Sequence, residues 1–360
     1  MGSVLKPSDY VHLHNHTHHS LLDGLTKIPD LVDKVKEMGM EAVAITDHGT
    51  MSGSIELYKA ALEAGIKPII GFEAYVASRS RHDRDPAKDK ARFHITLLAM
   101  NNQGYQNLMQ LSTIANLEGV YYKPRIDHEL LEKYSEGLIV LSGCSSGELG
   151  YNLKNDNYEA AKDIAKWYKS IFGDRYYLEM QDHLWSEQVK VNKYLAKLSV
   201  DLDIPLVISN DGHYLVAEDQ DAHEILLCVG TGAFLTDENR MSLKEFDLHV
   251  TDPKEIIEKW GTEFPEAILN TKRIADRCNI ELKLGGILIP TFPTPNGKSE
   301  KSYLEDLVYS GLAWRYGGLD RDKASELTIE KAKKHIPADV LKGQSTSLGL
   351  LKAWALTVTS

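Results

Sequence analysis

Short runs of apolar residues recur through the first part of the chain, and longer amphipathic segments separate them. A short apolar run between turn-forming residues is typical of a strand that is buried on both faces of a parallel sheet. Seven runs of this kind predict strands at Tyr10–His14, Ala42–Thr46, Lys67–Tyr75, Phe93–Ala99, Leu138–Ser142, Tyr176–Met180 and Leu206–Ser209.

The segments between these runs carry apolar residues three or four positions apart, which is the period of an amphipathic helix. Strands that alternate with helices indicate a parallel sheet with helical crossovers, and seven such units can close into a barrel related to the (β/α)8 type. We therefore expect an α/β fold, a distorted seven-stranded TIM-like (β/α)7 barrel. The predicted helices are Ile28–Met38, Ser54–Ala64, Gln103–Asn116, Tyr158–Phe172 and Glu187–Leu202.

The pattern changes after about residue 230, where helices follow one another without buried strands between them. These helices are expected at Pro253–Trp260, Pro265–Arg277 and Ser302–Tyr316, and the Pro- and Gly-rich stretch Ile289–Ser299 is expected to be an extended connector. We predict a catalytic barrel over 1–230, a helical extension over 231–285, a linker and the start of a further region over 286–341, and a separate tail over 342–360.

Potential metal ligands follow the predicted strands at the positions where each strand ends. Active sites of parallel barrels lie at the carboxyl ends of the strands, and His-x-His or Asp-x-His spacing puts both side chains on one face of an extended chain. His94 is the exception, because it lies early in its strand and fits only if that strand is offset. The candidates are His14 and His16, His48, Glu73, His94, Cys144, and Asp211 with His213.

Imidazole, carboxylate and one thiolate suit zinc, manganese or iron and fit calcium poorly. A lone His at a strand end is usually only a polar residue of the rim, and this simpler interpretation is kept for His12, His18, His19 and His183. Taken alone, Asp47 can be a helix cap and Cys144 a small buried residue. Two dyads together with an acid or a His at nearly every strand end favour a metal site over chance.

Charge and cysteine content narrow the functional class. The 360 residues carry a formal net charge of −11, which argues against a broad DNA-wrapping surface but not against a small site where metal ions supply positive charge. Three scattered cysteines do not form a disulfide framework, and no signal peptide or apolar membrane span is apparent. We therefore expect a cytoplasmic protein without membrane contact.

The candidate ligands lie in a set of short motifs: His-Leu-His-Asn-His-Thr and Ser-Leu-Leu-Asp-Gly (within 12–24), Ile-Thr-Asp-His-Gly (45–49), Gly-Phe-Glu (71–73), His-Ile-Thr-Leu-Leu-Ala (94–99), Leu-Ser-Gly-Cys (141–144) and Asn-Asp-Gly-His-Tyr (210–214). Four further motifs are Asn-Asn-Gln-Gly-Tyr-Gln-Asn-Leu (101–108), Tyr-Lys-Pro-Arg-Ile-Asp (122–127), Ala-His-Glu-Ile-Leu (222–226) and Asn-Thr-Lys-Arg-Ile-Ala-Asp-Arg-Cys (270–278). The first set resembles the PHP domain of bacterial DNA polymerase III alpha subunits, the C-family replicative polymerases. The second set resembles that subunit rather than generic PHP phosphatases.

The resemblance implies a distorted PHP barrel that holds two to three divalent metals through nine ligands, all of which are present. By motif, one metal would be bound by His14, His16, Glu73 and Asp211, a second by Glu73, His94 and Cys144, and a third by Asp23, His48 and His213. It also implies 3′–5′ exonuclease activity on a single-stranded DNA 3′ end, with Glu73, Asp211, His48 and His213 as the catalytic residues. Lys123 and Arg125 are candidates to bind phosphate, although a solvated loop pair is an equal alternative.

In the family, the chain continues into a polymerase palm and thumb and works with other replisome subunits. The expected palm pattern, E-R-x-x-x-E-L-x-I-I-x-x-M-G-F-x-G-Y-F, is missing from residues 342–360. Codons can be chosen for these residues so that the same nucleotides, read in the frame that starts one nucleotide earlier, encode the expected palm pattern. We therefore predict an out-of-frame tail that does not pack on the barrel, with an unrelated natural tail as the alternative, and no polymerase activity.

Two other functions remain open from the sequence. A small-molecule phosphatase would use the same metals, and the polymerase-like segments count against it. A non-catalytic scaffold that binds a separate proofreading exonuclease subunit would be expected to have lost ligands, and none is lost here.

Overall fold

The computed structural model describes residues 5–183, 185–286 and 290–342. The chain forms two compact units, Met1–Leu282 and Lys283–Ser360. The predicted domain boundaries near residues 230, 285 and 341 stay predictions. The predicted out-of-frame tail, apart from Lys342, lies outside the described residues.

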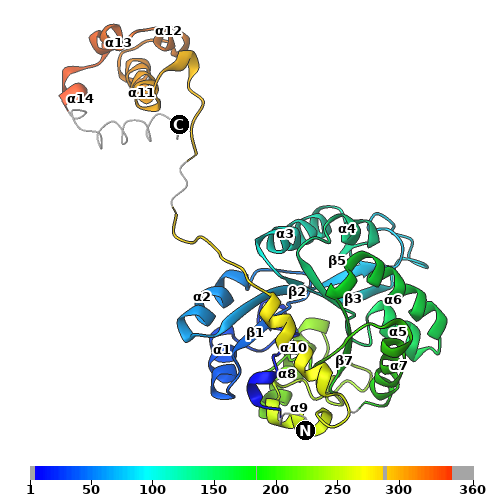
Figure 1. The fold of residues 1–360 in the computed structure, drawn as a ribbon. Helices are drawn as coiled ribbons and strands as arrows, with labels where there is room; N and C mark the ends of the chain where they lie inside the picture. Colours follow the sequence, from blue (N-terminus) through cyan, green and yellow to red (C-terminus); the bar gives the residue numbers. More distant parts are fainter. Residues whose placement is uncertain (1–4, 184, 287–289, 343–360) are drawn as a thin grey trace. The chain divides into compact units, whose positions relative to one another are not determined.

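One curled sheet organises the first unit (Figure 1). The strand order is β4-β5-β2-β3-β6-β7-β8. Strand β1 pairs with the first residues of β2 (67–70), whereas β5 pairs with Tyr75 and Val76 near its end. The strands are β1 (Ala42–Ile45), β2 (Lys67–Ala77), β3 (Arg92–Ala99), β4 (Val120–Tyr121), β5 (Lys123–Ile126), β6 (Leu138–Leu141), β7 (Tyr176–Gln181) and β8 (Leu206–Ser209).

The N-terminal segment joins the two edges of this sheet. His12 forms a parallel bridge with Val43 of β1, and Asn15 forms one with Gly212, just beyond β8. Seven segments therefore surround the barrel: residues 12–15, β1, β2, β3, β6, β7 and β8. The predicted distorted seven-stranded α/β barrel is confirmed, although its first member is a bridged extended segment and the short strands β4 and β5 were not predicted.

Strand β3 differs from the prediction, because it runs antiparallel to both β2 and β6. The physical reason lies in the connection from β2 to β3. Residues 78–91 contain no helix, so the chain returns through a loop and not through the helical crossover that a parallel neighbour needs. The other pairings among β1, β2, β6, β7 and β8 are parallel.

Helices cover the outside of the sheet, as Figure 1 shows. Local signals fix several of their ends: the Asn101 side chain accepts from the Gly104 N–H at the start of α3, and Gly65 ends α2 with a φ of 76°. The helices are α1 (Ile28–Glu37), α2 (Ser54–Ala64), α3 (Asn102–Leu117), α4 (His128–Lys133), α5 (Glu148–Lys154), α6 (Tyr158–Phe172), α7 (Ser186–Leu202), α8 (Gln220–Thr231), α9 (Pro253–Trp260) and α10 (Pro265–Arg277), with short 3-10 turns η1 (Pro7–Asp9), η2 (Gly173–Arg175) and η3 (Ala217–Asp219).

The barrel interior is apolar at one end. The cluster that fills it takes one or two residues from each surrounding strand, and Ile274, Ala275 and Cys278 at the end of α10 pack into the same cluster. Because α10 contributes to this cluster, the apolar end of the barrel is closed and a polar site has only the opposite end available. The strand contributions are Val11, Leu13, Ala42, Ala44, Ile69, Leu98, Ile139, Leu141, Tyr177 and Val207.

The second unit is helical. It has a small core of its own, to which Val308 and Leu312 of one helix and Ala332 of another contribute. Its described elements are η4 (Pro295–Gly297), α11 (Glu300–Tyr316), α12 (Arg321–Ser325), α13 (Ile329–His335) and α14 (Ala338–Lys342). Throughout the described ranges, no helix is both long enough and apolar enough to cross a membrane.

Candidate metal centre

The inward-facing row of each strand changes from apolar to polar toward one end of the barrel. On β2 the row runs from Ile69 to Glu73, and beyond β8 it runs from Val207 to Asp211. On β3 it runs from Leu98 back to His94, because that strand is antiparallel. The reversed direction explains how His94, at the start of its strand, reaches the same end as residues that follow theirs.

Four donor groups converge on one point at this end. The Nε2 atoms of His14 and His16 lie 3.2 Å apart, and Asp211 Oδ1 lies 3.3 Å and 3.1 Å from them. Glu73 Oε1 lies 3.4 Å from His14 Nε2, and Glu73 Oε2 lies 3.8 Å from His16 Nε2. A tetrahedral site with ligand bonds near 2.1 Å separates its donors by about 3.4 Å. These four groups therefore fit a transition-metal ion with little rearrangement.

Glu73 also faces a second group of ligands. Its Oε1 lies 3.0 Å from His94 Nδ1, and Cys144 Sγ lies 3.5 Å from the same nitrogen. One carboxylate thus lies between two sets of nitrogen or sulfur donors, as a bridging ligand must. Glu73 is buried, whereas His94 and Cys144 are partly open to solvent.

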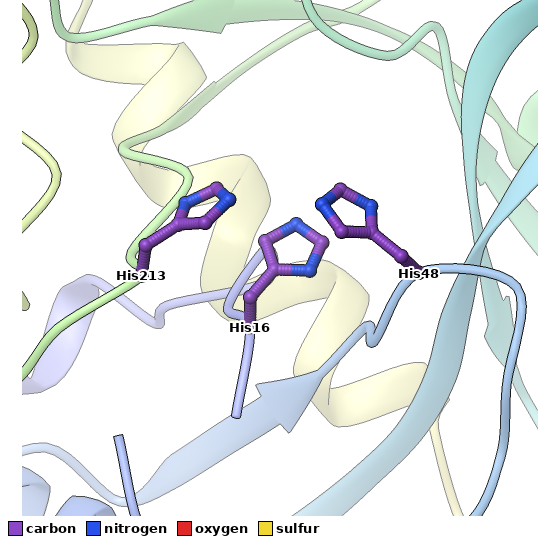
Figure 2. A group of neighbouring side chains, drawn as sticks. All are labelled: His16, His48 and His213. Carbon is purple, nitrogen blue, oxygen red and sulfur yellow. The ribbon is translucent and has the colours of Figure 1, made fainter. Parts of the chain in front are cut away.

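The three residues of the third group, Asp23, His48 and His213, lie on three separate loops. His48 Nε2 lies 2.7 Å from Asp23 Oδ2, and His213 Nε2 lies 3.9 Å from Asp23 Oδ1. Figure 2 shows His16 between His48 and His213, and donor atoms of these three rings lie within 4.8 Å of one another. The first and third groups are therefore contiguous, and His48 Nδ1 reaches Glu73 Oε2 at 2.6 Å. All nine predicted ligands lie together, and their role as metal ligands stays a prediction.

Several buried oxygens of this cluster lack hydrogen bonds. Among the described residues, Asp23 Oδ1, both Glu73 carboxylate oxygens and Asp211 Oδ1 accept no hydrogen bond of good geometry, although nitrogens of the predicted ligand histidines lie within ion-pair distance of each. Leaving a buried carboxylate oxygen unsatisfied is costly, and a cation is the partner that removes the cost. The unsatisfied oxygens lie in all three predicted groups, so the donor set fits bound metal ions.

The electrostatics of the cluster keep its carboxylates ionised, whereas at His14, His48 and His94 burial is outweighed by these carboxylates and the pKa of the imidazole is raised, so these three ligands must release a proton when a metal binds. Burial raises the pKa of Glu73, but the charges of His94 and His48 outweigh it and hold that pKa well below its usual range. Burial is likewise outweighed at Asp211, where His14 and His16 hold the pKa well below normal. Burial, together with the neighbouring His48 and His213, lowers the pKa of His16 to about 3. Ionised carboxylates and a neutral imidazole are ready metal ligands.

The sequence did not single out the buried residues that hold the ligands. Glu179 Oε1 accepts from His14 Nδ1 at 2.6 Å, and Gln181 Nε2 donates to Asp211 Oδ2 at 3.1 Å. Ser20 Oγ lies 3.1 Å from His16 Nδ1. The signal in the sequence was a pair of polar residues two positions apart, Glu179 and Gln181, in the otherwise apolar and aromatic run of β7.

Asp47 is one of these supporting residues, not a helix cap. Its Oδ1 accepts from the Ser20 hydroxyl at 2.8 Å and from the Thr17 N–H at 2.7 Å. Because Ser20 in turn contacts His16, Asp47 fixes the loop that carries the first ligands.

The phosphate-binding prediction is wrong for Arg125. Its side chain is fully buried, and the guanidinium donates to the carbonyl oxygens of Gly119, Asp89, Arg81 and Asp83 at 2.8–3.2 Å. Four carbonyl acceptors from two loops replace the water that an exposed arginine would bind, which is why burial is tolerated.

Lys123, unlike Arg125, has a solvent-exposed side chain. Its Nζ lies 5.6 Å from the centre of the Tyr75 ring, and it lines the cavity beside the ligands. This cavity has a volume of about 720 Å³ and opens onto Asp23, His48 and His94. A second cation, Arg92, lines the same cavity and was not predicted.

The histidines that were set aside lie around the cluster. His12 Nε2 is 2.9 Å from the Thr251 carbonyl oxygen, and His183 is buried against Phe246. His18 and His19 lie near Glu56 at the surface, where Glu56 Oε2 is 3.1 Å from His19 Nε2 and 4.0 Å from His18 Nε2. Donor atoms of these last three residues lie close enough to hold an ion, although such exposed groups commonly hold none.

Comparison with known proteins gives a consistent result. Residues 12–183 match the family model described as the PHP domain. DNA polymerase III subunit alpha of Borreliella burgdorferi is 42% identical over 315 residues, covering 87% of this chain and 27% of that protein. The same subunit of Treponema pallidum is 44% identical over 310 residues, covering 85% and 26%. The chain thus spans about a quarter of the length of these relatives.

Among solved structures, a two-domain protein from Bacteroides vulgatus, described as containing a predicted PHP-like metal-dependent phosphoesterase, has a TM-score of 0.35 and 15% identity. The match covers 75% of this chain and 66% of that one. At this score the likeness adds no argument to the fold described above.

Proposed function

Because this chain carries a PHP domain like that of DNA polymerase III alpha subunits, we propose that it hydrolyses phosphodiester bonds at a DNA 3′ end with the help of bound metal ions. In the intact polymerase this would be a proofreading 3′–5′ exonuclease beside the palm and thumb, working with other replisome subunits. The observation that carries the proposal is the convergence of nine donor groups with unsatisfied carboxylate oxygens at one end of the barrel.

We propose that His14, His16, Asp23, His48, Glu73, His94, Cys144, Asp211 and His213 hold two or three zinc, manganese or iron ions. Such ions, when bound, lower the pKa of water and neutralise charge on a reacting phosphate. Glu73 and Asp211 supply the negative charge that keeps cations in place, and Glu73 spans two of the groups. His48 and His213 complete the side of the cluster that faces Asp23.

The cavity beside the cluster supports a nucleotide substrate. Arg92 and Lys123 can bind the phosphates of an incoming strand, while Leu21, Leu22 and Met241 offer exposed apolar surface to a base. A cavity of this size is typical for a small ligand or a single nucleotide. Because cations and apolar residues both line it, the cavity suits the end of a strand better than a bare phosphate ester.

Two substrate assays on one preparation test the proposal. Release of nucleotide from 3′-labelled single-stranded DNA is compared with release of phosphate from p-nitrophenyl phosphate, with Asp211→Asn as the inactive control. The proposal expects metal-dependent nucleotide release that Asp211→Asn abolishes. Hydrolysis of the small ester alone would favour a phosphatase, and no hydrolysis of either substrate by metal-loaded protein would favour a scaffold for a separate exonuclease subunit.

A further inference from the structure

Strand β7 (Tyr176–Gln181) ends in polar residues, yet it is the one strand of the seven-membered barrel with no predicted ligand in it or just after it. Its inward row is Tyr177, Glu179 and Gln181, because Tyr177 belongs to the interior cluster and side chains alternate along a strand. All three are buried. A buried Glu without a lysine or arginine partner needs a specific reason, since carboxylates are rarely fully buried unless paired.

Glu179 is held by four hydrogen bonds. Oε1 accepts from Ser209 Oγ and His14 Nδ1, each at 2.6 Å. Oε2 accepts from the Gly143 N–H at 3.1 Å and from Thr96 Oγ1 at 3.3 Å. The acceptor capacity of the carboxylate is thus used by donors from four other segments, so its position is fixed.

This fixed carboxylate determines which nitrogen of His14 carries the proton. A carboxylate only accepts, so His14 must donate from Nδ1, and the Nε2 lone pair is left facing Glu73 and Asp211. His14 is completely buried and has no alternative solvent partner. Among the neutral tautomers of His14, Glu179 thus selects the one with the proton on Nδ1, and it orients Nε2 toward the predicted metal position.

Gln181 does the same for the neighbouring ligand. Its Nε2 donates to Asp211 Oδ2, which leaves Oδ1 directed at the Nε2 atoms of His14 and His16. The backbone of Gln181 is itself fixed, because its N–H donates to Asn192 Oδ1 and its carbonyl accepts from Asn192 Nδ2. Two consecutive inward residues of β7 thus orient two ligands of one predicted metal site.

We propose that Glu179 and Gln181 are positioning residues that tune the affinity of the His14–His16–Glu73–Asp211 site for its metal, which rests on the proposed metal-dependent function. Partners of this kind typically change metal affinity by about 10–100-fold. The effect is confined to one site, since neither residue contacts His94, Cys144, Asp23 or His48 through any hydrogen bond that the structure describes.

Glu179→Gln is the sharpest test. The amide has nearly the same shape, but its NH2 group must face either His14 Nδ1 or the Gly143 N–H, and both contacts are wrong for a donor. Facing His14, it favours the tautomer with a proton on Nε2, where the metal binds. Gln181→Met removes the donor to Asp211 at similar volume and provides a second variant if Glu179→Gln folds poorly.

Glu148→Gln is the matched control. Glu148 also accepts from a histidine, His128, and from the Tyr168 hydroxyl, but it lies outside the metal cluster. Its substitution should alter stability without altering metal affinity, which separates a general packing defect from a positioning effect.

The experiment titrates the metal-free protein with Co²⁺, following visible absorption and calorimetric binding. We expect wild type to bind two to three ions and Glu179→Gln and Gln181→Met to weaken one of them by about 10–100-fold, with the remaining ions and Glu148→Gln unchanged. Affinities within about twofold of wild type in both β7 variants, or equal weakening at every site, would overturn the inference while leaving the proposed function intact. A wild-type protein that binds no Co²⁺ would instead overturn the proposed function itself.

Discussion

Replacing Arg125 tests the structure where it departs most from the sequence. Arg125→Met keeps much of the side-chain volume of a fully buried residue and removes its guanidinium. The four carbonyl oxygens of Gly119, Asp89, Arg81 and Asp83 then lose their hydrogen bonds to the side chain, and only that of Gly119 keeps a bond to the residue, from the backbone N–H at position 125. The Lys123→Met variant on the same strand is the matched control, because that side chain is exposed and lines the cavity.

The expected loss of stability follows from these four bonds. Each hydrogen bond to a charged group contributes about 1.5–3 kcal/mol. Water can reach part of the 78–91 loop once it loosens, so we count about half of the total and expect a loss of about 3–6 kcal/mol. At about 2 °C per kcal/mol for a unit of this size, the melting temperature should fall by about 6–12 °C.

Urea unfolding and a thermal scan measure the effect, and nuclease assays below the melting temperature measure function. Arg125→Met should be strongly destabilised and Lys123→Met unchanged within about 0.5 kcal/mol, whereas Lys123→Met should raise KM for DNA. If Arg125→Met had the melting temperature of the wild type and lost DNA binding as Lys123→Met does, the structural role of the buried Arg125 side chain would be refuted.

Three further outcomes are expected. Removing bound metal with a chelator should lower the melting temperature, and adding zinc or manganese should restore it, because ligands that bind only the folded state stabilise it; a scan that does not respond to either would contradict the metal site. Glu73→Gln and Asp211→Asn should lower nuclease activity at least about 100-fold, while the activity of His18→Ala stays within about twofold of wild type. Asn is chosen at position 211 because the backbone there has a φ of 53°, which Asn tolerates. Similar losses of activity in all three variants would show that the site is misplaced. Asn101→Ala should cost about 1 kcal/mol by removing the α3 cap with activity unchanged, as measured by urea unfolding.

The sequence predicted the barrel well because its signals are local. Each buried strand is a short apolar run, and the ligands follow these runs at regular positions. The direction of β3 could not be derived from its apolar run, which has the same pattern in either direction. The missing helix between Tyr75 and Phe93 was the available signal.

The burial of Arg125 and the contact of Glu179 with His14 could not be predicted, because they depend on partners that only the fold brings together. An arginine is usually exposed, and Arg125 is buried because its guanidinium reaches the nearby Gly119 carbonyl and three carbonyls of the 78–91 loop, which is some way off in the sequence. Glu179 lies 165 positions from His14 in the chain, and only the folded barrel brings them to 2.6 Å. A polar pair two positions apart in a buried strand indicates such roles but does not identify the partner.

Metal analysis and an exonuclease assay on one sample test the central proposal most directly. The purified protein is divided, one half is stripped and reloaded with Mn²⁺, and both halves receive 3′-labelled single-stranded DNA. The proposal predicts two to three metal ions per chain and nucleotide release that tracks metal content and is lost in Asp211→Asn. A chain that holds its metals and releases nothing from the DNA 3′ end would contradict it.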